Sequence, residues 1–294
     1  ITQKIHDYRA ERITSYLNLV DRIVKKKFEY FKTELVESKQ ALDNYIAQLP
    51  NTSDLKKGFL QLMDEGIAFK ENLKHYIENQ LTPGAIDVNI MTKLDKDNSV
   101  GKEQLPVEFN DAHAALRGFA NSNLASSVVL SAGMNPRLYS YFENFSCFFP
   151  DLNNTLKKKI TLKVSDFRSA MIQGNFLAKK GLWVSEYRIE SGLNCGGHAF
   201  ATDGLLLGPI LEEFKLNKNA LYDELFNTCQ AALAQKNKPQ YKEKPKMKVT
   251  VQGGIGTSQE NDFLYHHYEV DLTGWGSPFL LVPEATNVDK ETLG

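Results

Sequence analysis

One histidine of this chain lies where a protein could use it for chemistry. His198 follows Gly196 and Gly197, and the apolar run of residues 182–189 before this segment predicts a β-strand. An imidazole has an ordinary pKa near ~6.5, so it can act as a general base or acid at neutral pH. A structural histidine held by backbone groups is the alternative interpretation. Cys195 likewise has two interpretations, a nucleophile or a small buried side chain.

A second glycine segment, residues 253–257, follows another apolar run and precedes a helix start predicted at Ser258. Glycines let backbone N–H groups approach an anion, and a helix N-terminus adds partial positive charge, so Gly253 and Gly254 are candidates for binding phosphate. A tight turn explains such glycines equally well. Gly276 and Ser277 follow the next apolar run, and the loops after the last two strands of a β/α barrel commonly form one phosphate site. This second turn favours phosphate binding.

Three polar residues lie within or at the end of predicted strands: Asn89, Lys163 and Glu190. Lys163 is the most informative, because an ammonium inside an apolar strand is costly unless it faces an anion or a polar ligand. A structural pair with Asp166 or Glu190 would satisfy it equally well. The remaining histidines that we considered have no comparable setting and are expected to be structural or on the surface: His113, His266 and His267.

The elements that must position these residues alternate between strand and helix after Pro83. Apolar runs predict six strands, at residues 86–91, 127–130, 160–164, 182–189, 247–251 and 270–272. Helical spacing separates most of them, at 111–119, 167–179 and 205–233. Such alternation is typical of a parallel sheet with right-handed crossovers. The expected fold class is therefore α/β, a (β/α)8 TIM barrel with six strands visible, and an open doubly wound sheet is the alternative.

Residues 1–82 differ from the rest and are expected to form a helical N-terminal segment or insertion, and residues 83–294 the barrel. Apolar residues recur at helical spacing from Ile13 to Val24 and again from Phe59 to Phe69, with a break near Pro50. A solvated helix is the simpler interpretation of the charged stretch near Lys25, and a partner-binding arm is the alternative. The two missing barrel strands are expected upstream of Ile1 or within sequence that reads as helix.

Composition excludes several classes of protein. The net charge is -1, with 35 Lys and Arg against 36 Asp and Glu, so no overall charge attracts nucleic acid or an acidic membrane. The basic stretch of residues 236–248 is broken by Pro239 and Pro245 and is expected to be a solvated loop. Hydrophobic residues make up 42% of the chain, yet no apolar run is long enough to span a bilayer.

The three cysteines have no metal-ligand spacing and are an odd number, so neither a zinc site nor a disulfide framework is indicated. We therefore expect a reducing, cytoplasmic location. We also expect the chain to be a fragment, because it begins at Ile1 and ends in sequence that would start a helix. The oligomeric state stays open between a monomer and a homo-oligomer.

Taken in order, the strand ends resemble those of the FMN-dependent β/α-barrel family of nitronate monooxygenases (2-nitropropane dioxygenases) and flavin enoyl-acyl-carrier-protein reductases. Five segments carry the resemblance, and they cover residues 85 to 290: Val88-Asn89, Leu130-Ser131-Ala132-Gly133, Gly192 to His198, Gln252-Gly253-Gly254-Ile255, and Gly276 to Leu280 with Glu284-Ala285.

The resemblance implies a flavoprotein oxidoreductase acting on a small organic molecule. FMN would lie across the barrel mouth with its phosphate on the four turn residues, Gly253, Gly254, Gly276 and Ser277. Asn89, Lys163 and Glu190 would contact the rest of the cofactor. His198 would be the base that removes a proton from the carbon α to a nitro group, while the flavin would carry the redox chemistry.

Two alternatives to this function stand beside it. An FMN enzyme of the same family could reduce an enoyl thioester with NAD(P)H. From another class, a non-catalytic phosphate-ligand or interaction module would use residues 1–80 as a partner-binding arm. Flavin colour separates this last interpretation from the two enzymes.

Overall fold

The computed structural model describes residues 1, 5–51, 53–63, 69–91, 95–190, 207–253 and 255–275. The chain divides into two compact units, one formed by Ser15–Ile86 and the other by Ile1–Thr14 together with Asp87–Gly294. The boundary near residue 86 is close to the expected one at 82. The first residues differ from expectation, since Ile1–Thr14 groups with the sheet and not with the helices that follow it.

The unit Ser15–Ile86 is helical, as predicted for this part of the chain. It contains most of α1 (Tyr8–Glu37), followed by α2 (Lys39–Gln48), α3 (Asp54–Met63) and α4 (Phe69–Gln80). The Ser38 side chain accepts a hydrogen bond from the Ala41 amide and caps α2. This unit has its own hydrophobic core. The core consists of Leu35, Leu42, Ile46, Phe59, Leu73, Ile77 and, just after α4, Leu81. No strand occurs among the described residues before Asp87, so the idea that barrel strands lie hidden there is wrong for those residues.

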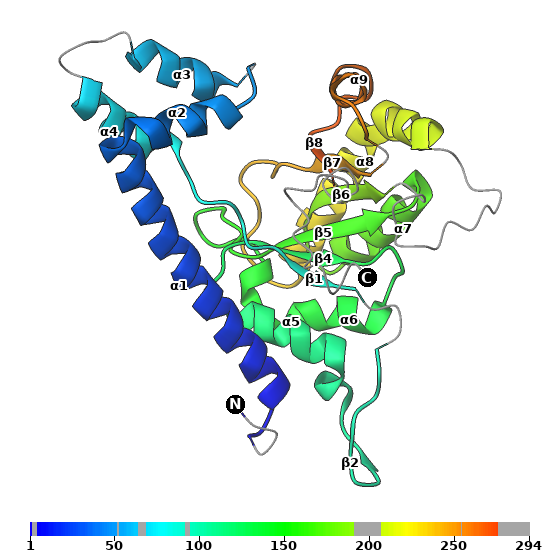
Figure 1. Cartoon of the computed structure of the whole chain (residues 1–294). Helices are drawn as coiled ribbons and strands as arrows, with labels where there is room; N and C mark the ends of the chain where they lie inside the picture. The colour runs from blue at the N-terminus through cyan, green and yellow to red at the C-terminus, as the bar shows by residue number, and fades with distance from the viewer. Residues whose placement is uncertain are drawn as a thin grey trace, which may run out of the picture. The chain divides into compact units, whose positions relative to one another are not determined.

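The other unit is built on a six-stranded sheet in which all neighbouring strands are parallel (Figure 1). Its strands, in both chain order and sheet order, are β1 (Val88–Ile90), β4 (Ser127–Leu130), β5 (Lys159–Val164), β6 (Val184–Glu190), β7 (Lys248–Gln252) and β8 (Leu272–Gly274). The six predicted strands are confirmed. A small antiparallel hairpin of β2 (Ser99–Val100) and β3 (Glu103–Gln104) was not predicted, and Gly101 turns it with φ 62°.

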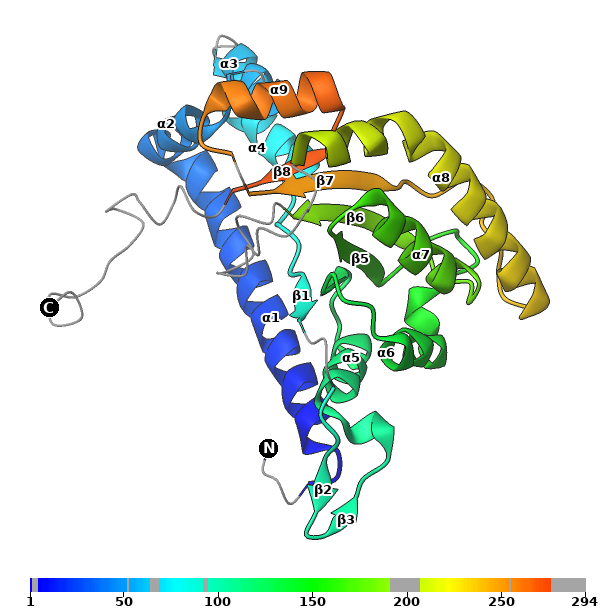
Figure 2. The same cartoon turned by 90° about the vertical axis from the view of Figure 1, so that its right-hand side faces the viewer.

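Helices connect successive strands of the sheet. They are α5 (Asp111–Asn121), α6 (Pro136–Tyr141), α7 (Phe167–Ala178), α8 (Leu207–Gln235) and α9 (Ser258–Tyr268), with short 3-10 turns at Val107–Phe109, Phe142–Asn144 and Ser146–Phe148. Figure 2 shows α5 to α8 following one another along one face. A doubly wound sheet reverses its strand order and carries helices on both faces. The described strands never reverse, which argues against that alternative.

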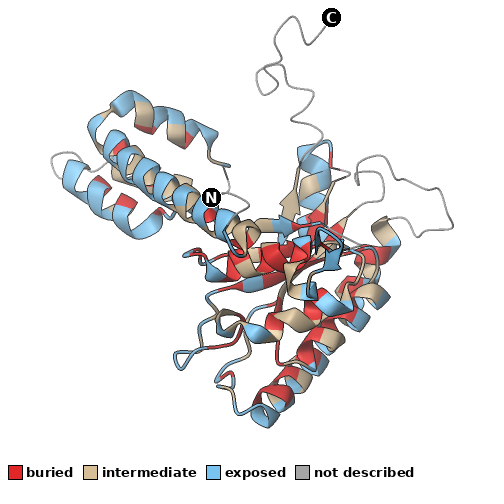
Figure 3. Cartoon of the chain, turned by 90° about the horizontal axis from the view of Figure 1, so that it is seen from below, coloured by how far each residue is buried: buried red, intermediate tan, exposed pale blue. Residues whose placement is uncertain are grey.

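The core of this unit lies between the sheet and the row of helices. Buried residues gather in the strands and on the helix sides that face them (Figure 3). Gly174 in α7 permits the closest approach, because a Cβ there would lie 2.1 Å from the Tyr187 hydroxyl oxygen. Tyr187 and Ile189 of β6 are fully buried on this side. Burying one such large side chain contributes about 1.5–3 kcal/mol, so the apolar side of each strand fixes which face meets the helices.

The basic stretch after α8 is a mostly exposed loop up to residue 247, as expected, although some of its lysines have partners. Lys236 forms an ion pair with Glu143 at 2.6 Å, and Lys244 pairs with Asp223 and lies over the Tyr222 ring. These lysines therefore do not present an unpaired basic surface. None of the helices that the structure describes is both long enough and apolar enough to cross a bilayer.

Candidate functional site

Four of the eight predicted site residues lie in the described part of the chain, and these are Asn89, Lys163, Glu190 and Gly253. The predicted base, His198, lies outside the described residues. So do three of the predicted phosphate contacts, Gly254, Gly276 and Ser277. The geometry of the site can therefore be built from the strands that lead to these segments.

Strands β5, β6 and β7 each alternate between apolar and polar residues, which places the polar ones on a single face. From Glu186 onward, the even-numbered residues of β6 are Glu186, Arg188 and Glu190, and all three are half-buried. Tyr187 and Ile189 point the other way, into the core beneath the helices. Side chains along a strand alternate between the two faces of the sheet. The charged residues of β6 therefore occupy the face opposite the helices.

Lys163 and Glu190 meet on this face as an ion pair. Their side chains are 19% and 18% exposed, and they come from β5 and β6 near the carboxyl ends of both strands. The structure thus selects Glu190 from the two partners that were considered. Asp166 has a different task, because its Oδ1 accepts a hydrogen bond of 2.6 Å from the Ser169 amide and caps α7.

A second polar cluster, which the sequence reasoning missed, lies beside this pair and centres on Glu186. Its Oε1 accepts hydrogen bonds from Arg188 Nε at 2.8 Å and from the Thr250 hydroxyl at 2.7 Å. Its Oε2 accepts a longer one, 3.5 Å, from the Thr161 hydroxyl. Three strands therefore contribute to one carboxylate. The signal was present in the sequence, since every second residue from Glu186 to Glu190 is charged.

Asn89 is separated from these clusters by one strand. In register, Asn89 of β1 lies opposite Val129 of β4, and Val129 lies opposite Thr161 of β5. Residues in register share a face, so Asn89 is on the polar side, but the buried Val129 stands between it and β5. The structure brings Lys163 and Glu190 together and leaves Asn89 apart from them.

Gly253 directly follows β7, and this position favours glycine because its φ is 82°. Its N–H donates to the Gly274 carbonyl oxygen at 3.0 Å, which continues the pairing of β7 with β8. A Cβ on Gly274 would in turn lie 2.7 Å from Cγ of Gln252. The Gly253 amide is thus used by the sheet in this structure.

The turn that follows is closed by its own helix. Thr257 caps α9, and Glu260 completes a capping box in which its Oε2 accepts from the amides of Gly256 at 2.8 Å and Thr257 at 3.0 Å. These backbone bonds lower the pKa of Glu260. The predicted helix start at Ser258 is confirmed. The turn does offer backbone donors to an anion, and the anion that receives them here is the Glu260 carboxylate.

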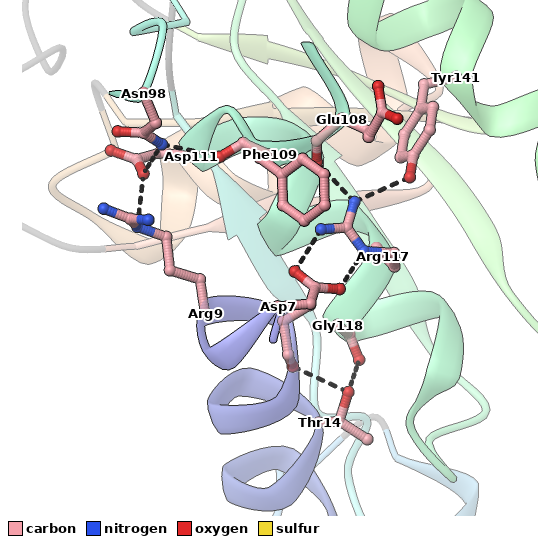
Figure 4. Close-up of polar contacts among 11 residues, drawn as sticks. Asp7, Arg9, Thr14, Asn98, Glu108, Phe109, Asp111, Arg117, Gly118 and Tyr141 are labelled. Atoms are coloured by element: carbon pink, nitrogen blue, oxygen red, sulfur yellow. Dashed lines mark hydrogen bonds and ion pairs between the residues drawn. The ribbon is translucent and has the colours of Figure 1, made fainter. Parts of the chain in front are cut away.

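A polar network involves the N-terminal segment and α5 (Figure 4). The Arg117 guanidinium in α5 bonds to both carboxylate oxygens of Asp7, and its Nη1 donates to the Glu108 carbonyl at 2.6 Å and the Tyr141 hydroxyl at 2.8 Å. Burial alone would lower the pKa of Arg117. The hydrogen bonds to Asp7 and Tyr141 outweigh that effect, so the pKa is raised. Close by, Thr14 donates to the Gly118 carbonyl at 3.0 Å. This network fastens Ile1–Thr14 to α5.

The other histidines have structural surroundings. His113 is buried and hydrogen-bonded to Asp95, whose second oxygen accepts from the Ala112 amide at 2.8 Å. His266 Nδ1 lies 2.8 Å from the Asp262 carbonyl oxygen, and His267 stacks on Phe263.

Two of the three cysteines lie in the described residues. Burial raises the pKa of Cys229 to about 12 and also raises that of Cys147. Neither thiol is poised as a nucleophile. Within the described ranges no group of three or more His, Cys, Asp or Glu side chains could hold a metal ion.

A pocket of about 140 Å³ lies on the helix side of the sheet, between α8 and the segment that joins α9 to β8. Its lining includes Phe214, Lys218, Val249 and Tyr268. Ligand pockets typically measure ~300–1,000 Å³, so this hollow is too small for a nucleotide cofactor. It is also on the face opposite the charged cluster, and we do not assign it to the candidate site.

The described residues thus define an α/β protein with a parallel sheet, helices along one face and a charged cluster on the other. No protein-family model, no curated protein and no solved structure matches the chain.

Proposed function

We propose that this chain is an FMN-dependent oxidoreductase of the nitronate monooxygenase type, acting on a small organic molecule. One observation carries the proposal. Lys163 and Glu190, which the resemblance assigns to the cofactor, lie near the carboxyl ends of neighbouring parallel strands, and this placement, not their ion pair, supports the proposal. Ligands of parallel α/β sheets bind at that end of the strands. The order of the five resembling segments adds independent support.

The proposal includes a (β/α)8 barrel. The sheet adds each new strand on the same side, which leaves β1 and β8 as its two edge strands among those described. A barrel closes when such a sheet curls until its edges are joined. Two further strands between β1 and β8 would bring the total to the eight of this fold.

The donors at the second glycine turn suit an anion such as the FMN phosphate. The amides of Gly256 and Thr257 already hold a carboxylate oxygen, and Glu260 is exposed, so it can leave without breaking the core. In the proposal, Gly254, Gly276 and Ser277 hold the phosphate together with the amides of Gly256 and Thr257, while the Gly253 amide stays bonded to the Gly274 carbonyl oxygen in the sheet. Glu260 is then a competitor that must move aside.

When bound, FMN would supply the electron-accepting chemistry that amino-acid side chains lack. The residues of this chain would bind and orient. Lys163, held by Glu190, presents a positive charge at the strand ends, where it can contact an electron-rich group. His198 would take the proton from the carbon α to the nitro group of the substrate. Asn89 would add a polar contact from β1.

A non-catalytic phosphate-ligand or interaction module is the second candidate, and the capping box favours it. If Glu260 stays on the Gly256 and Thr257 amides, the turn serves the helix alone. The Glu260→Ala variant separates the two ideas. Removal of the competing carboxylate should tighten FMN binding if this turn holds the phosphate, and should leave FMN uptake at zero if the chain is not a flavoprotein.

The deciding experiment is an absorbance spectrum of the purified chain before and after incubation with FMN and gel filtration. We expect a bound flavin band and oxygen consumption with a nitroalkane. Bleaching of the flavin by NAD(P)H without nitroalkane-dependent oxygen uptake would favour the enoyl-thioester reductase instead. A colourless chain that takes up no FMN would overturn both flavin functions.

A further inference from the structure

Arg188 lies at the centre of the charged face, on the middle strand of three that carry it. Its register partners are Lys163 on β5 and Thr250 on β7. The side chain is 17% exposed, and Tyr187 and Ile189 on either side of it are buried on the opposite face. The backbone of a central parallel strand therefore fixes where this guanidinium can reach.

The guanidinium of Arg188 is only partly used. Its Nε donates to Glu186 at 2.8 Å, and Nη1 and Nη2 make no hydrogen bond to any residue that the structure describes. A guanidinium has five N–H donors in a rigid planar fork. The bond through Nε holds one edge of the fork against Glu186. The edge that carries the two Nη atoms is left for another acceptor.

Glu186 is not available as that acceptor. Both of its oxygens are engaged, Oε1 by Arg188 and Thr250 and Oε2 by Thr161. Glu190 is held by Lys163. The two carboxylates on this strand thus have their own donors, and neither is left to cover the Nη edge.

The charge pattern also favours an anion here. Lys163 and Arg188 are directly opposite each other on neighbouring strands, and like charges in that arrangement repel. Glu186 and Glu190 reduce this repulsion from positions two residues away on β6. A bound anion between the two cations would relieve it further, and Gln252, in register with Glu190, adds a nearby amide.

We propose that the Nη edge of Arg188 binds a planar two-oxygen anion, the carboxylate of a small organic molecule, on the face of the sheet opposite the helices. A carboxylate matches the guanidinium fork with two parallel hydrogen bonds. The proposal goes beyond the flavin function and does not need FMN, so binding is tested on the flavin-free chain. Failure of FMN uptake would leave this site untouched.

The experiment measures propanoate binding to the flavin-free full chain by titration calorimetry, with propanamide as the neutral probe of the same shape. We expect propanoate to bind and propanamide not to bind. Arg188→Gln should weaken propanoate binding at least about tenfold, and Arg188→Lys, which keeps the charge but loses the fork, should also weaken it. The matched control is Arg168→Gln on the exposed side of α7, which should bind as the parent chain does.

A direct readout removes dependence on the variants. The side-chain NMR signals of Arg188 should shift on addition of propanoate to the parent chain. This measurement tests the site even if Arg188→Gln does not fold. Equal affinity for propanoate and propanamide would overturn the site, as would unchanged propanoate binding in folded Arg188→Gln. Tighter binding of inorganic phosphate than of propanoate would overturn the planar class of ligand.

Discussion

Arg117 and Arg188 are both arginines of the sheet unit with nearly the same side-chain exposure, 14% and 17%. Arg117 makes four hydrogen bonds, two to Asp7 and one each to Glu108 and Tyr141. Among the described residues, Arg188 makes one, to Glu186. Burial alone therefore does not distinguish the two side chains, whereas the number of donors used does.

The difference separates a structural charge from one that can serve a ligand. Desolvation of a guanidinium is costly unless its N–H groups are paired. Arg117 meets that cost entirely with protein groups and ties Ile1–Thr14 to α5. Arg188 meets it with a single carboxylate, so its free edge still gains by meeting an acceptor. The predictions for Arg117 and Arg188 test this comparison directly, and those for His198 and Glu260 test the segments that follow β6 and β7 in the chain.

The largest effect is expected from Arg117→Met. The change leaves the half-buried Asp7 carboxylate without its cation and removes the bonds to Glu108 and Tyr141, which should cost about 3 kcal/mol of unfolding free energy. Urea unfolding monitored by circular dichroism measures it, with Arg188→Gln as the matched variant. A smaller loss for Arg117→Met than for Arg188→Gln would break the comparison.

His198→Asn should act on the reaction and not on the fold. If His198 is the general base, turnover with a nitroalkane should fall roughly 10²-fold or more while FMN stays bound. Oxygen uptake normalised to flavin content gives the turnover, and the unfolding midpoint should match that of the parent chain. Unchanged turnover would remove His198 from the mechanism.

Arg188→Gln should change stability only slightly, by about 1 kcal/mol or less, because Glu186 keeps its bonds to Thr250 and Thr161. The same urea titration measures this. The expected pattern is a near-normal midpoint combined with weakened propanoate binding. A loss of several kcal/mol would place Arg188 with Arg117 as a structural residue.

The smallest effect is expected from Glu260→Gln, and it depends on pH. The folded pKa of Glu260 is lowered by the Gly256 and Thr257 amides, so its contribution is complete above the unfolded value of ~4.3 and is lost as pH falls through the folded value. Thermal unfolding at several acidic pH values should show a shallower pH dependence in the variant. Equal slopes for both chains would show that the negative charge of Glu260 contributes nothing measurable to stability.

The strands of the sheet could be predicted because each is an apolar run of strand length. Helices α5, α7 and α8 could be predicted for the same kind of reason, since their apolar residues recur at helical spacing. The hairpin of β2 and β3 could not, because Ser99–Val100 and Glu103–Gln104 are short, exposed and without apolar alternation. Helix α6 was also missed, although it buries Leu138 and Tyr139, because its six residues are too few to show a helical period.

The candidate site was predicted less completely. Lys163 stood out because a charge within an apolar strand needs a partner, but only the register of β5 and β6 decides between Glu190 and Asp166. Two signals were overlooked, the charged alternation of β6 around Arg188 and the capping-box pattern from Thr257 to Glu260. Which donors remain unused depends on three strands at once, and no local pattern contains that information.

The surroundings of Cys147, which is half-buried, and Cys229, which is buried, have a practical consequence for chemical labelling. With both pKa values raised, these thiols are poor nucleophiles near neutral pH. We therefore expect maleimide labelling of the native protein to be slow at Cys147 and Cys229.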